Sequence, residues 1–316
     1  MKAEGDSIHQ LMQKKFYERT NQMAGELLSN PYVQEFRQQH PDLQKNEIRT
    51  NLSRVYQFAG DQKHCDNCPG LELCPLDFKG HHTKLYVQDT ESGLKLYDRK
   101  APCKKQIVYS HNESIKKRIS SYFIDVDLLE SAFDAIEIVK REPQRTLAVR
   151  EIMEYINSVK SNKESLPING LYLQGSFGTG KTFLMSYLLY EMAKLGYTGV
   201  IVYMPEFIED LKMMMTHNAK LRQTIQALKD TDFLVFDDIG AEALNPWARD
   251  HILGAILNHR MNKKPTFYTS NYAMSDLLKH LSFTNKEGES KIKGQRLMER
   301  IEPFVKVVEV YGKNQR

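Results

Sequence analysis

The sequence has no long apolar run and no apolar segment in its opening residues, and each absence excludes a class of protein. Its 316 residues contain four cysteines. No stretch approaches the roughly 18 consecutive apolar residues that a membrane-spanning helix requires. The opening residues, MKAEGDSIHQ, lack the apolar core of a secretory signal peptide. We therefore expect a soluble, cytoplasmic protein with no membrane contact.

A strong excess of one charge is also absent. Lysine and arginine number 44 against 40 aspartates and glutamates, a net charge of +4 that is spread evenly along the chain. This balance argues neither for nor against nucleic acid, which is bound chiefly through clustered positive charge. With 41% hydrophobic and 27% charged residues, the composition is that of an ordinary globular protein. The length predicts two domains or one large one.

The cysteines are concentrated in one region. They are Cys65, Cys68, Cys74 and Cys103. In a chain without a secretion signal, this clustering indicates metal rather than disulfides. Cys65 and Cys68 are spaced so that both thiolates can face one ion, and zinc would need two more ligands. The candidates are Cys74, His81, His82 and Cys103. Four cysteines would also suit an iron–sulfur cluster, and Cys74 is alternatively a small buried thiol.

The pattern of apolar residues predicts two structurally different parts. Residues 1–60 have helical periodicity, and Asn30 followed by Pro31 predicts the start of a new helix. Alternating runs at 84–88 and 94–98 predict a hairpin. Beyond a polar stretch, apolar runs at 171–173, 200–203, 233–236, 266–269 and 304–310 alternate with helical segments. This alternation predicts an α/β domain with a parallel sheet.

We therefore expect three segments along the chain. Residues 1–106 would form a small, mainly helical, metal-binding domain. Residues 107–120 would be a linker, because this stretch is polar. Residues 121–316 would form the α/β domain.

The strongest motif follows the first strand of the predicted sheet. It has the pattern G-x-x-x-x-G-K-T and consists of Gly175, Ser176, Phe177, Gly178, Thr179, Gly180, Lys181 and Thr182. Glycines let such a loop curl so that backbone N–H groups point at phosphate oxygens, and the following helix adds its partial positive charge. Lys181 would reach the β- and γ-phosphates and Thr182 would hold Mg²⁺. The motif predicts a site for ATP and Mg²⁺.

Polar side chains at the ends of two later strands complete this site. Asp237 and Asp238 end the apolar run 233–236. We expect Asp237 to orient Mg²⁺ through water and Asp238 to polarise the attacking water. Asn271 follows the next strand, whose end lies beside the phosphate loop in a parallel sheet. Its amide is expected to contact the γ-phosphate or the attacking water.

With these motifs the chain resembles an AAA+ ATPase. Gly175–Thr182 matches Walker A, Phe233–Asp238 matches Walker B, and Asn271 matches sensor I. Four segments are similar to those of the bacterial replicative helicase loaders of the DnaI/DnaC group: VYMPEF (202–207), FDDIGAE (236–242), LNHRMNKKPTFYTSN (257–271) and QRLMERI (295–301). The cysteine-rich region before the ATPase resembles the DnaI-like branch.

The resemblance implies further site residues. It favours zinc bound by Cys65, Cys68, His82 and Cys103, with Cys74 as the alternative ligand. It also places trans-acting arginines at Arg296 and Arg300, which would reach the nucleotide of a neighbouring subunit. A helical spacing of i, i+4 would put both on one face. Alternatively each is solvated or paired with Glu299 or Glu302. Arg249 and Arg260 are weaker candidates, and Arg260 also suits a structural role.

Two departures from the AAA+ pattern affect the expected activity. The second Walker B carboxylate is usually Glu, whereas Asp238 is one methylene shorter, so hydrolysis is expected to be slow. The sequence printed after Val310 leaves no room for a helical lid, so we expect the lid and its sensor II arginine to be absent or minimal.

The resemblance implies an ATP-dependent loader that acts in the primosome. It would bind the hexameric replicative DNA helicase and deliver it onto single-stranded DNA during initiation or restart of DNA replication, and it would self-associate with ATP. One alternative is a transposition helper of the IstB type, against which the cysteine-bearing N-terminal region argues. Another is a metal-dependent adaptor with a structural nucleotide, against which Lys181, Asp237 and Asn271 argue.

Overall fold

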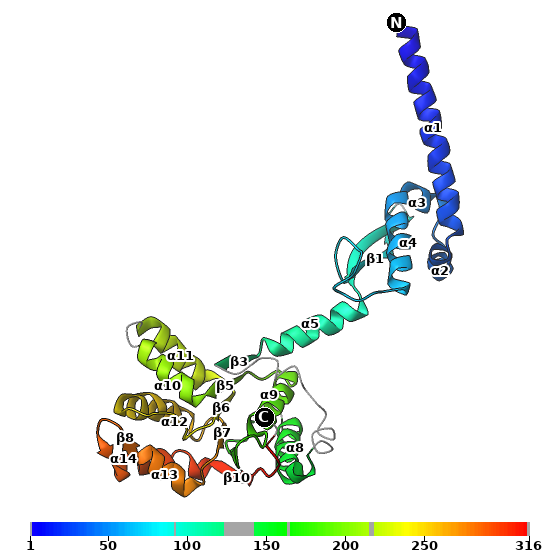
Figure 1. Cartoon of the computed structure of the whole chain (residues 1–316). Helices are drawn as coiled ribbons and strands as arrows, with labels where there is room; N and C mark the ends of the chain where they lie inside the picture. The colour runs from blue at the N-terminus through cyan, green and yellow to red at the C-terminus, as the bar shows by residue number, and fades with distance from the viewer. Residues whose placement is uncertain (1, 92, 123–141, 163–164, 215–217, 315–316) are drawn as a thin grey trace. The chain divides into compact units, whose positions relative to one another are not determined.

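The computed structural model describes residues 2–91, 93–122, 142–162, 165–214 and 218–314. The chain forms two compact units, Met1–Asn112 and Glu113–Arg316 (Figure 1). The boundary between them falls inside the segment 107–120 that the sequence predicts to be a linker. Each unit has its own buried core and is described separately.

In the first unit, helices precede an antiparallel hairpin. The elements are α1 (Lys2–Ser29), α2 (Pro31–Gln39), α3 (Lys45–Thr50), α4 (Leu52–Asp66), β1 (His81–Thr90) and β2 (Gly93–Pro102). The predicted helix start at Asn30 is confirmed, because its side-chain oxygen accepts a hydrogen bond from the Tyr32 N–H at 3.0 Å. This cap satisfies one of the N–H groups that a helix start leaves unpaired.

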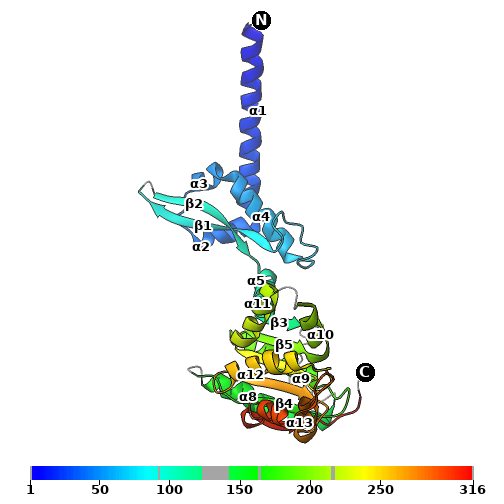
Figure 2. The same cartoon turned by 90° about the vertical axis from the view of Figure 1, so that its left-hand side faces the viewer.

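The core of the first unit lies between these helices and the hairpin. Val33, Ile48 and Val55 from the helices pack with Leu85 and Leu96 from the strands, all nearly inaccessible to solvent. Each such side chain contributes about 1.5–3 kcal/mol when fully buried. Figures 1 and 2 show α1 extending far beyond the other elements of this unit.

The segment predicted as a linker contains regular structure. Helix α5 spans Lys104–Lys116, and strand β3 begins at Ile119. Among the residues of α5 only Ile115 is buried, whereas Ile107, Val108 and Tyr109 are exposed. The stretch is mostly polar, which is why its sequence looks like an irregular connection.

The second unit is built on a six-stranded parallel sheet with the strand order β10-β4-β7-β6-β5-β3. The strands are β3 (Ile119–Tyr122), β4 (Gly170–Gln174), β5 (Gly199–Tyr203), β6 (Phe233–Asp237), β7 (Thr266–Ser270) and β10 (Val305–Glu309). The five apolar runs in the sequence correspond to all of these strands except β3. The predicted α/β class with a parallel sheet is thus confirmed.

Helices cover both faces of this sheet. They include α8 (Thr146–Ser161), α9 (Lys181–Lys194), α10 (Met204–Met214), α11 (Asn218–Asp230), α12 (Gly254–Arg260), α13 (Met274–Ser282) and α14 (Lys291–Met298). Alternate strand residues enter two separate cores. Leu173 and Val235 pack with α8 and α9, whereas Phe236 and Tyr268 pack with α10, α12 and α13. Burial on both faces explains the continuous apolar runs.

In a parallel sheet with such crossovers, the carboxyl ends of the strands lie at one edge. The motifs that follow β4, β6 and β7 therefore converge there. None of the helices in the described part of the chain is long and apolar enough to cross a membrane.

Candidate nucleotide-binding site

The loop between β4 and α9 has the conformation that its glycines permit. Gly178 and Gly180 have φ angles of +71° and +90°, in the left-handed region that other residues rarely adopt. Helix α9 begins at Lys181, directly after the loop. The first N–H groups of a helix have no partner within the helix, and its dipole places partial positive charge there. Loop and helix start together offer a site for an anion.

Lys181 is folded back onto this loop. Its ammonium donates to the carbonyls of Gly175 and Ser176, both at 2.9 Å, and to the side-chain oxygen of Asn271 at 2.7 Å. Lys181 is only 8% exposed. A buried ammonium needs such acceptors, and phosphate oxygens offer stronger ones.

Asp237 lies beside the start of α9. The Thr182 hydroxyl donates to both of its carboxylate oxygens, at 2.9 and 3.0 Å, and the Thr269 hydroxyl donates to Oδ1 at 2.6 Å. Burial raises the pKa of Asp237, an effect that these two hydroxyls and Lys181 oppose. A carboxylate and a hydroxyl so placed have the oxygen chemistry that Mg²⁺ prefers.

Asp238 adopts an unusual backbone conformation, with a φ angle of +56°. Its N–H donates to the Thr269 hydroxyl at 2.8 Å, and its Oδ1 accepts from the Asn271 amide at 3.0 Å. Asn271 therefore joins Asp238 to Lys181. Left-handed backbone costs a non-glycine residue about 1–2 kcal/mol, and such strain clusters at functional sites. Aspartate tolerates this region better than most residues.

The structure thus brings together the predicted residues Lys181, Thr182, Asp237, Asp238 and Asn271. Sequence reasoning gave no role to Thr269, although its position on β7 next to Asn271 was a usable signal.

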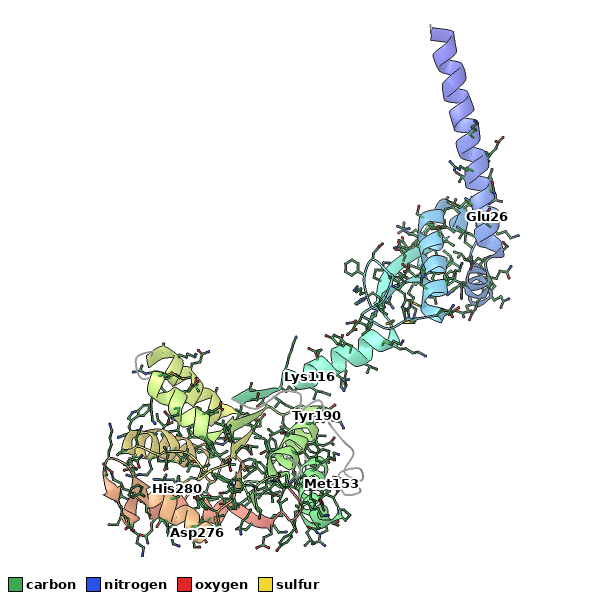
Figure 3. All side chains as sticks on the ribbon, viewed as in Figure 1. Glu26, Lys116, Met153, Tyr190, Asp276 and His280 are labelled. Carbon is green, nitrogen blue, oxygen red and sulfur yellow. The ribbon has the colours of Figure 1, made fainter. Side chains whose placement is uncertain are left out.

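No role for Glu242 or His280 was predicted from the sequence. Glu242 is 2% exposed, accepts from the Gly240 N–H at 2.7 Å and lies 3.3 Å from His280 Nε2. His280 lies on α13 and is labelled in Figure 3. These contacts fix the turn that follows β6.

The arginines predicted to act in trans lie at and after the end of α14. Arg296 is exposed on α14, and Arg300 lies in the turn beyond Met298, so the helix does not extend to both. Arg300 Nη1 donates to the Arg296 carbonyl at 3.2 Å. Within the described residues neither guanidinium pairs with a carboxylate, so the alternative of an ion pair with Glu299 or Glu302 is not observed.

The two weaker candidates are structural. Arg249 is 0% exposed, and its guanidinium pairs with Asp250 and Glu287. Arg260 is 1% exposed and donates to five backbone carbonyls and to Thr266. Burial lowers the pKa of Arg260 to about 10. Both side chains are thus buried and held by partners within the second unit.

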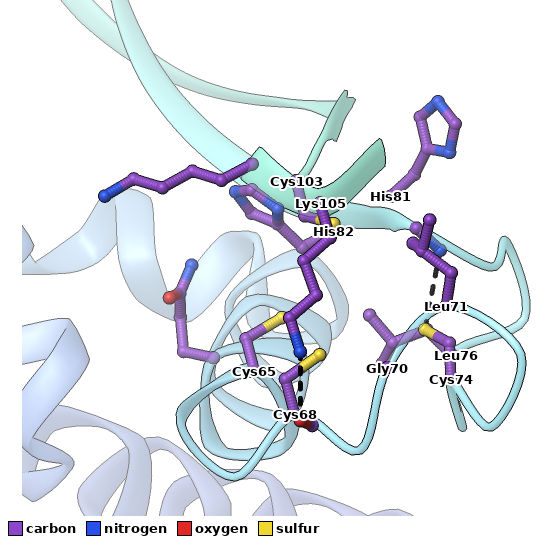
Figure 4. A pocket seen from close by; sticks show the side chains of 13 residues that line it. Cys65, Cys68, Gly70, Leu71, Cys74, Leu76, His81, His82, Cys103 and Lys105 are labelled. Carbon is purple, nitrogen blue, oxygen red and sulfur yellow. Dashed lines mark hydrogen bonds between the residues drawn. The ribbon is translucent and has the colours of Figure 1, made fainter. Parts of the chain in front are cut away.

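The cysteines line a separate pocket in the first unit, with a volume of about 260 Å³ (Figure 4). All four cysteines line it together with His81 and His82. The Gly80 N–H donates to Cys74 Sγ at 3.4 Å. Burial, and then the neighbouring thiols, raise the pKa of Cys65.

These side chains do not form a ready-made metal centre. Within the described residues, no three His, Cys, Asp or Glu side chains are placed to hold a metal ion. The donor chemistry nevertheless fits zinc, because four thiols and the imidazoles of His81 and His82 line one pocket. His82 Nδ1 is buried and has no hydrogen-bond partner in the described part of the chain.

The fold and the phosphate loop define an ATP-binding α/β protein of the P-loop class. A model of IstB-like ATP binding proteins matches residues 167–313, and a model described as primosomal protein DnaI N-terminus matches residues 1–94. The replicative helicase loader DnaI of Bacillus subtilis (strain 168) is 30% identical over 303 residues, which cover 95% of this chain and 94% of that relative. The chain belongs to the DnaI family of AAA+ helicase loaders.

Other similar proteins match a smaller part of the chain. A putative ATP-binding protein of insertion sequence IS1162 from Pseudomonas fluorescens is 29% identical over 142 residues, 45% of this chain and 59% of that protein. A crystal structure of DnaI is 30% identical and covers 64% of this chain and 99% of its own, with a TM-score of 0.48. The predicted family is confirmed by the relative that matches both units.

Proposed function

We propose that this protein is an ATP-dependent loader that binds the hexameric replicative DNA helicase and delivers it onto single-stranded DNA. The observation that carries the proposal is the likeness to a replicative helicase loader across 95% of the chain, including both units. The likeness to IstB-like proteins is confined to the nucleotide-binding part, so a transposition helper has weaker support.

We further propose how the site holds ATP. The loop N–H groups and the start of α9 would bind the phosphates. Lys181 would exchange the carbonyls of Gly175 and Ser176 for phosphate oxygens. Thr182 and Asp237 would hold Mg²⁺, directly or through water, and the ion would neutralise charge on the β- and γ-phosphates.

Hydrolysis would depend on Asp238 and Asn271. A water between them and the γ-phosphate would be polarised by the Asp238 carboxylate and oriented by the Asn271 amide. Its oxygen would bond to the γ-phosphorus as the bond to the ADP oxygen breaks. The short side chain of Asp238 favours slow turnover, which suits a protein whose ATP controls assembly.

ATP would act as a switch that controls the contact between subunits. Arg296 and Arg300 lack carboxylate partners in the described residues and are free to reach the γ-phosphate of a neighbour. ATP would then favour self-association, and hydrolysis would weaken it. The assembled subunits would contact single-stranded DNA.

The first unit would dock on the helicase and contain one structural zinc. We propose Cys65, Cys68, His82 and Cys103 as ligands, with Cys74 as the alternative to His82. The unpartnered His82 Nδ1 supports His82 as a ligand, whereas the pocket itself is shared by all four cysteines. Zinc would stabilise the small unit that displays the docking surface.

A binding experiment tests the proposed partner. The purified full chain should retain the purified cognate hexameric helicase on an affinity resin, whereas an equal amount of a helicase from a distant bacterium should be retained less. Failure of the folded, zinc-loaded chain to retain the cognate helicase would contradict the proposal.

A further inference from the structure

Arg145 is a buried cation that the proposed ATP chemistry does not use. It ends the short helix η1 (Pro143–Arg145) and precedes α8. The residue is 7% exposed, and its Nε and Nη2 have no hydrogen-bond partner among the residues that the structure describes. Such donors are rarely left unpaired when buried, and a buried charge without acceptors is more costly still.

The guanidinium lies against the phosphate loop. A Cβ atom added to Gly180 would lie 2.9 Å from Arg145 Cζ and within 3.2 Å of both terminal nitrogens. Gly180 immediately precedes Lys181, the first residue of α9. The segment after β10 also lies close to the guanidinium, because a Cβ on Gly312 would lie 3.6 Å from Arg145 Nε.

This position places positive charge next to positive charge. The start of α9 has the partial positive charge of the helix dipole, and Lys181 adds a full charge. Burial lowers the pKa of Arg145, and Glu142 is the group that opposes this effect. Glu142 also accepts from the Lys313 N–H at 3.4 Å, so its carboxylate is shared with the segment after β10. The arrangement becomes favourable once an anion enters the loop.

We propose that Arg145 is a nucleotide-binding residue, whose Nε and Nη2 donate to phosphate oxygens of ATP bound by the same subunit. These two donors form the fork that matches a phosphate group in a bidentate contact. The inference depends on ATP occupying the phosphate loop and is independent of helicase loading. Failure of the loading function would therefore leave it intact.

The first test compares Arg145→Met with the wild-type full chain. ATP affinity, measured by calorimetry with Mg²⁺, should fall about 10- to 100-fold, the effect of losing charged hydrogen bonds. The melting temperature without nucleotide should be unchanged or higher, because a buried charge with two unpaired donors has been removed. A merely structural arginine gives the opposite pair of results, with lower apo stability and unchanged affinity, and would overturn the inference.

Two further variants keep the test decisive. Arg150→Met is the matched control, since Arg150 lies on α8, is exposed and pairs only with Glu151 and Glu154 in the described residues. Arg150→Met should change neither the ATP affinity nor the melting temperature without nucleotide. Arg145→Lys keeps the charge and loses the fork, so it should bind ATP with intermediate affinity. If Arg145→Met does not fold, wild-type affinity in Arg145→Lys would overturn the bidentate contact.

Inorganic tripolyphosphate identifies the atoms involved. Competing against labelled ATP, it should lose affinity for Arg145→Met by the same factor as ATP itself. A loss for ATP with no loss for tripolyphosphate would place the guanidinium on the nucleoside and overturn the phosphate assignment.

Discussion

The Lys181 ammonium donates to the Asn271 side chain at 2.7 Å, although the two residues are 90 positions apart in sequence. The contact joins the phosphate loop after β4 to the end of β7. Through the Asn271 amide it continues to Asp238, so the loop and both strand ends form one polar network. A nucleotide that recruits Lys181 must change this network, which couples binding to the residues proposed for hydrolysis.

Replacing Lys181 with alanine should abolish tight ATP binding. The variant loses the charge that faces the phosphates, so ATP affinity should fall by about 100-fold or more. Lys194→Ala is the matched control on the same helix, because Lys194 is exposed and its described ion pair is with Glu191. Calorimetry that finds unchanged affinity in Lys181→Ala would contradict the site assignment.

Asp238→Asn should separate binding from hydrolysis. Asparagine tolerates the left-handed backbone at this position and keeps an oxygen for the Asn271 amide. It cannot polarise water as a carboxylate does, so single-turnover hydrolysis should slow by about 100-fold or more while ATP affinity changes little. Hydrolysis at the wild-type rate in this variant would show that Asp238 has another role.

Thr269 should act by positioning the two aspartates. Thr269→Val removes the donor to Asp237 and the acceptor for the Asp238 N–H, at a cost of about 1–3 kcal/mol of stability. The Mg²⁺ concentration that half-saturates ATP hydrolysis should rise, and Thr269→Ser should restore it. A purely structural role would lower the melting temperature and leave the Mg²⁺ dependence unchanged.

Much of the second unit could be predicted because strands β4, β5, β6 and β7 are buried on both faces, so their sequences form short runs with no charged residue before the strand end. The edge strand β10 has only Val308 buried, but valines still dominate its sequence. Strand β3 was missed because Ile119–Tyr122 is short and contains two serines. Helix α5 was not predicted because its sequence is mostly polar and only Ile115 of its side chains is buried.

The site residues likewise divide into those that the sequence predicts and those that it does not. Spacing alone identifies the phosphate loop, and strand ends identify Asp237, Asp238 and Asn271. Arg145 could not be assigned from spacing, because its role depends on burial and on neighbours distant in sequence. The clustering of the cysteines predicts a metal site. Which four side chains would bind the metal depends on loop conformation, which cysteine spacing does not encode.

The zinc proposal predicts about one equivalent of zinc per chain. Cys65→Ser and Cys103→Ser should lose the metal and lower the melting temperature of the full chain, since metal binding contributes folding energy. Cys74→Ser should keep the metal and His82→Ala should lose it. Elemental analysis that finds iron, or zinc retained in His82→Ala and lost in Cys74→Ser, would overturn the proposed ligand set.

Mixing two inactive variants tests whether Arg296 and Arg300 act on the nucleotide of a neighbouring subunit. A chain with Lys181→Ala cannot bind ATP, and one with both Arg296→Ala and Arg300→Ala binds it but cannot complete a neighbour's site. Each alone should be nearly inactive, because an arginine finger contributes about a thousandfold or more in rate. Their mixture should recover part of the ATPase activity. No recovery in mixtures that demonstrably co-assemble would contradict action in trans.

Reconstituted helicase loading tests whether this protein delivers the helicase in an ATP-dependent manner. Purified helicase should unwind a primer on a closed, single-stranded circle coated with single-strand binding protein only when this protein and ATP are present. Lys181→Ala should fail in the same assay although it is folded. Equal unwinding with and without the protein, or full activity of Lys181→Ala, would contradict an ATP-dependent loader.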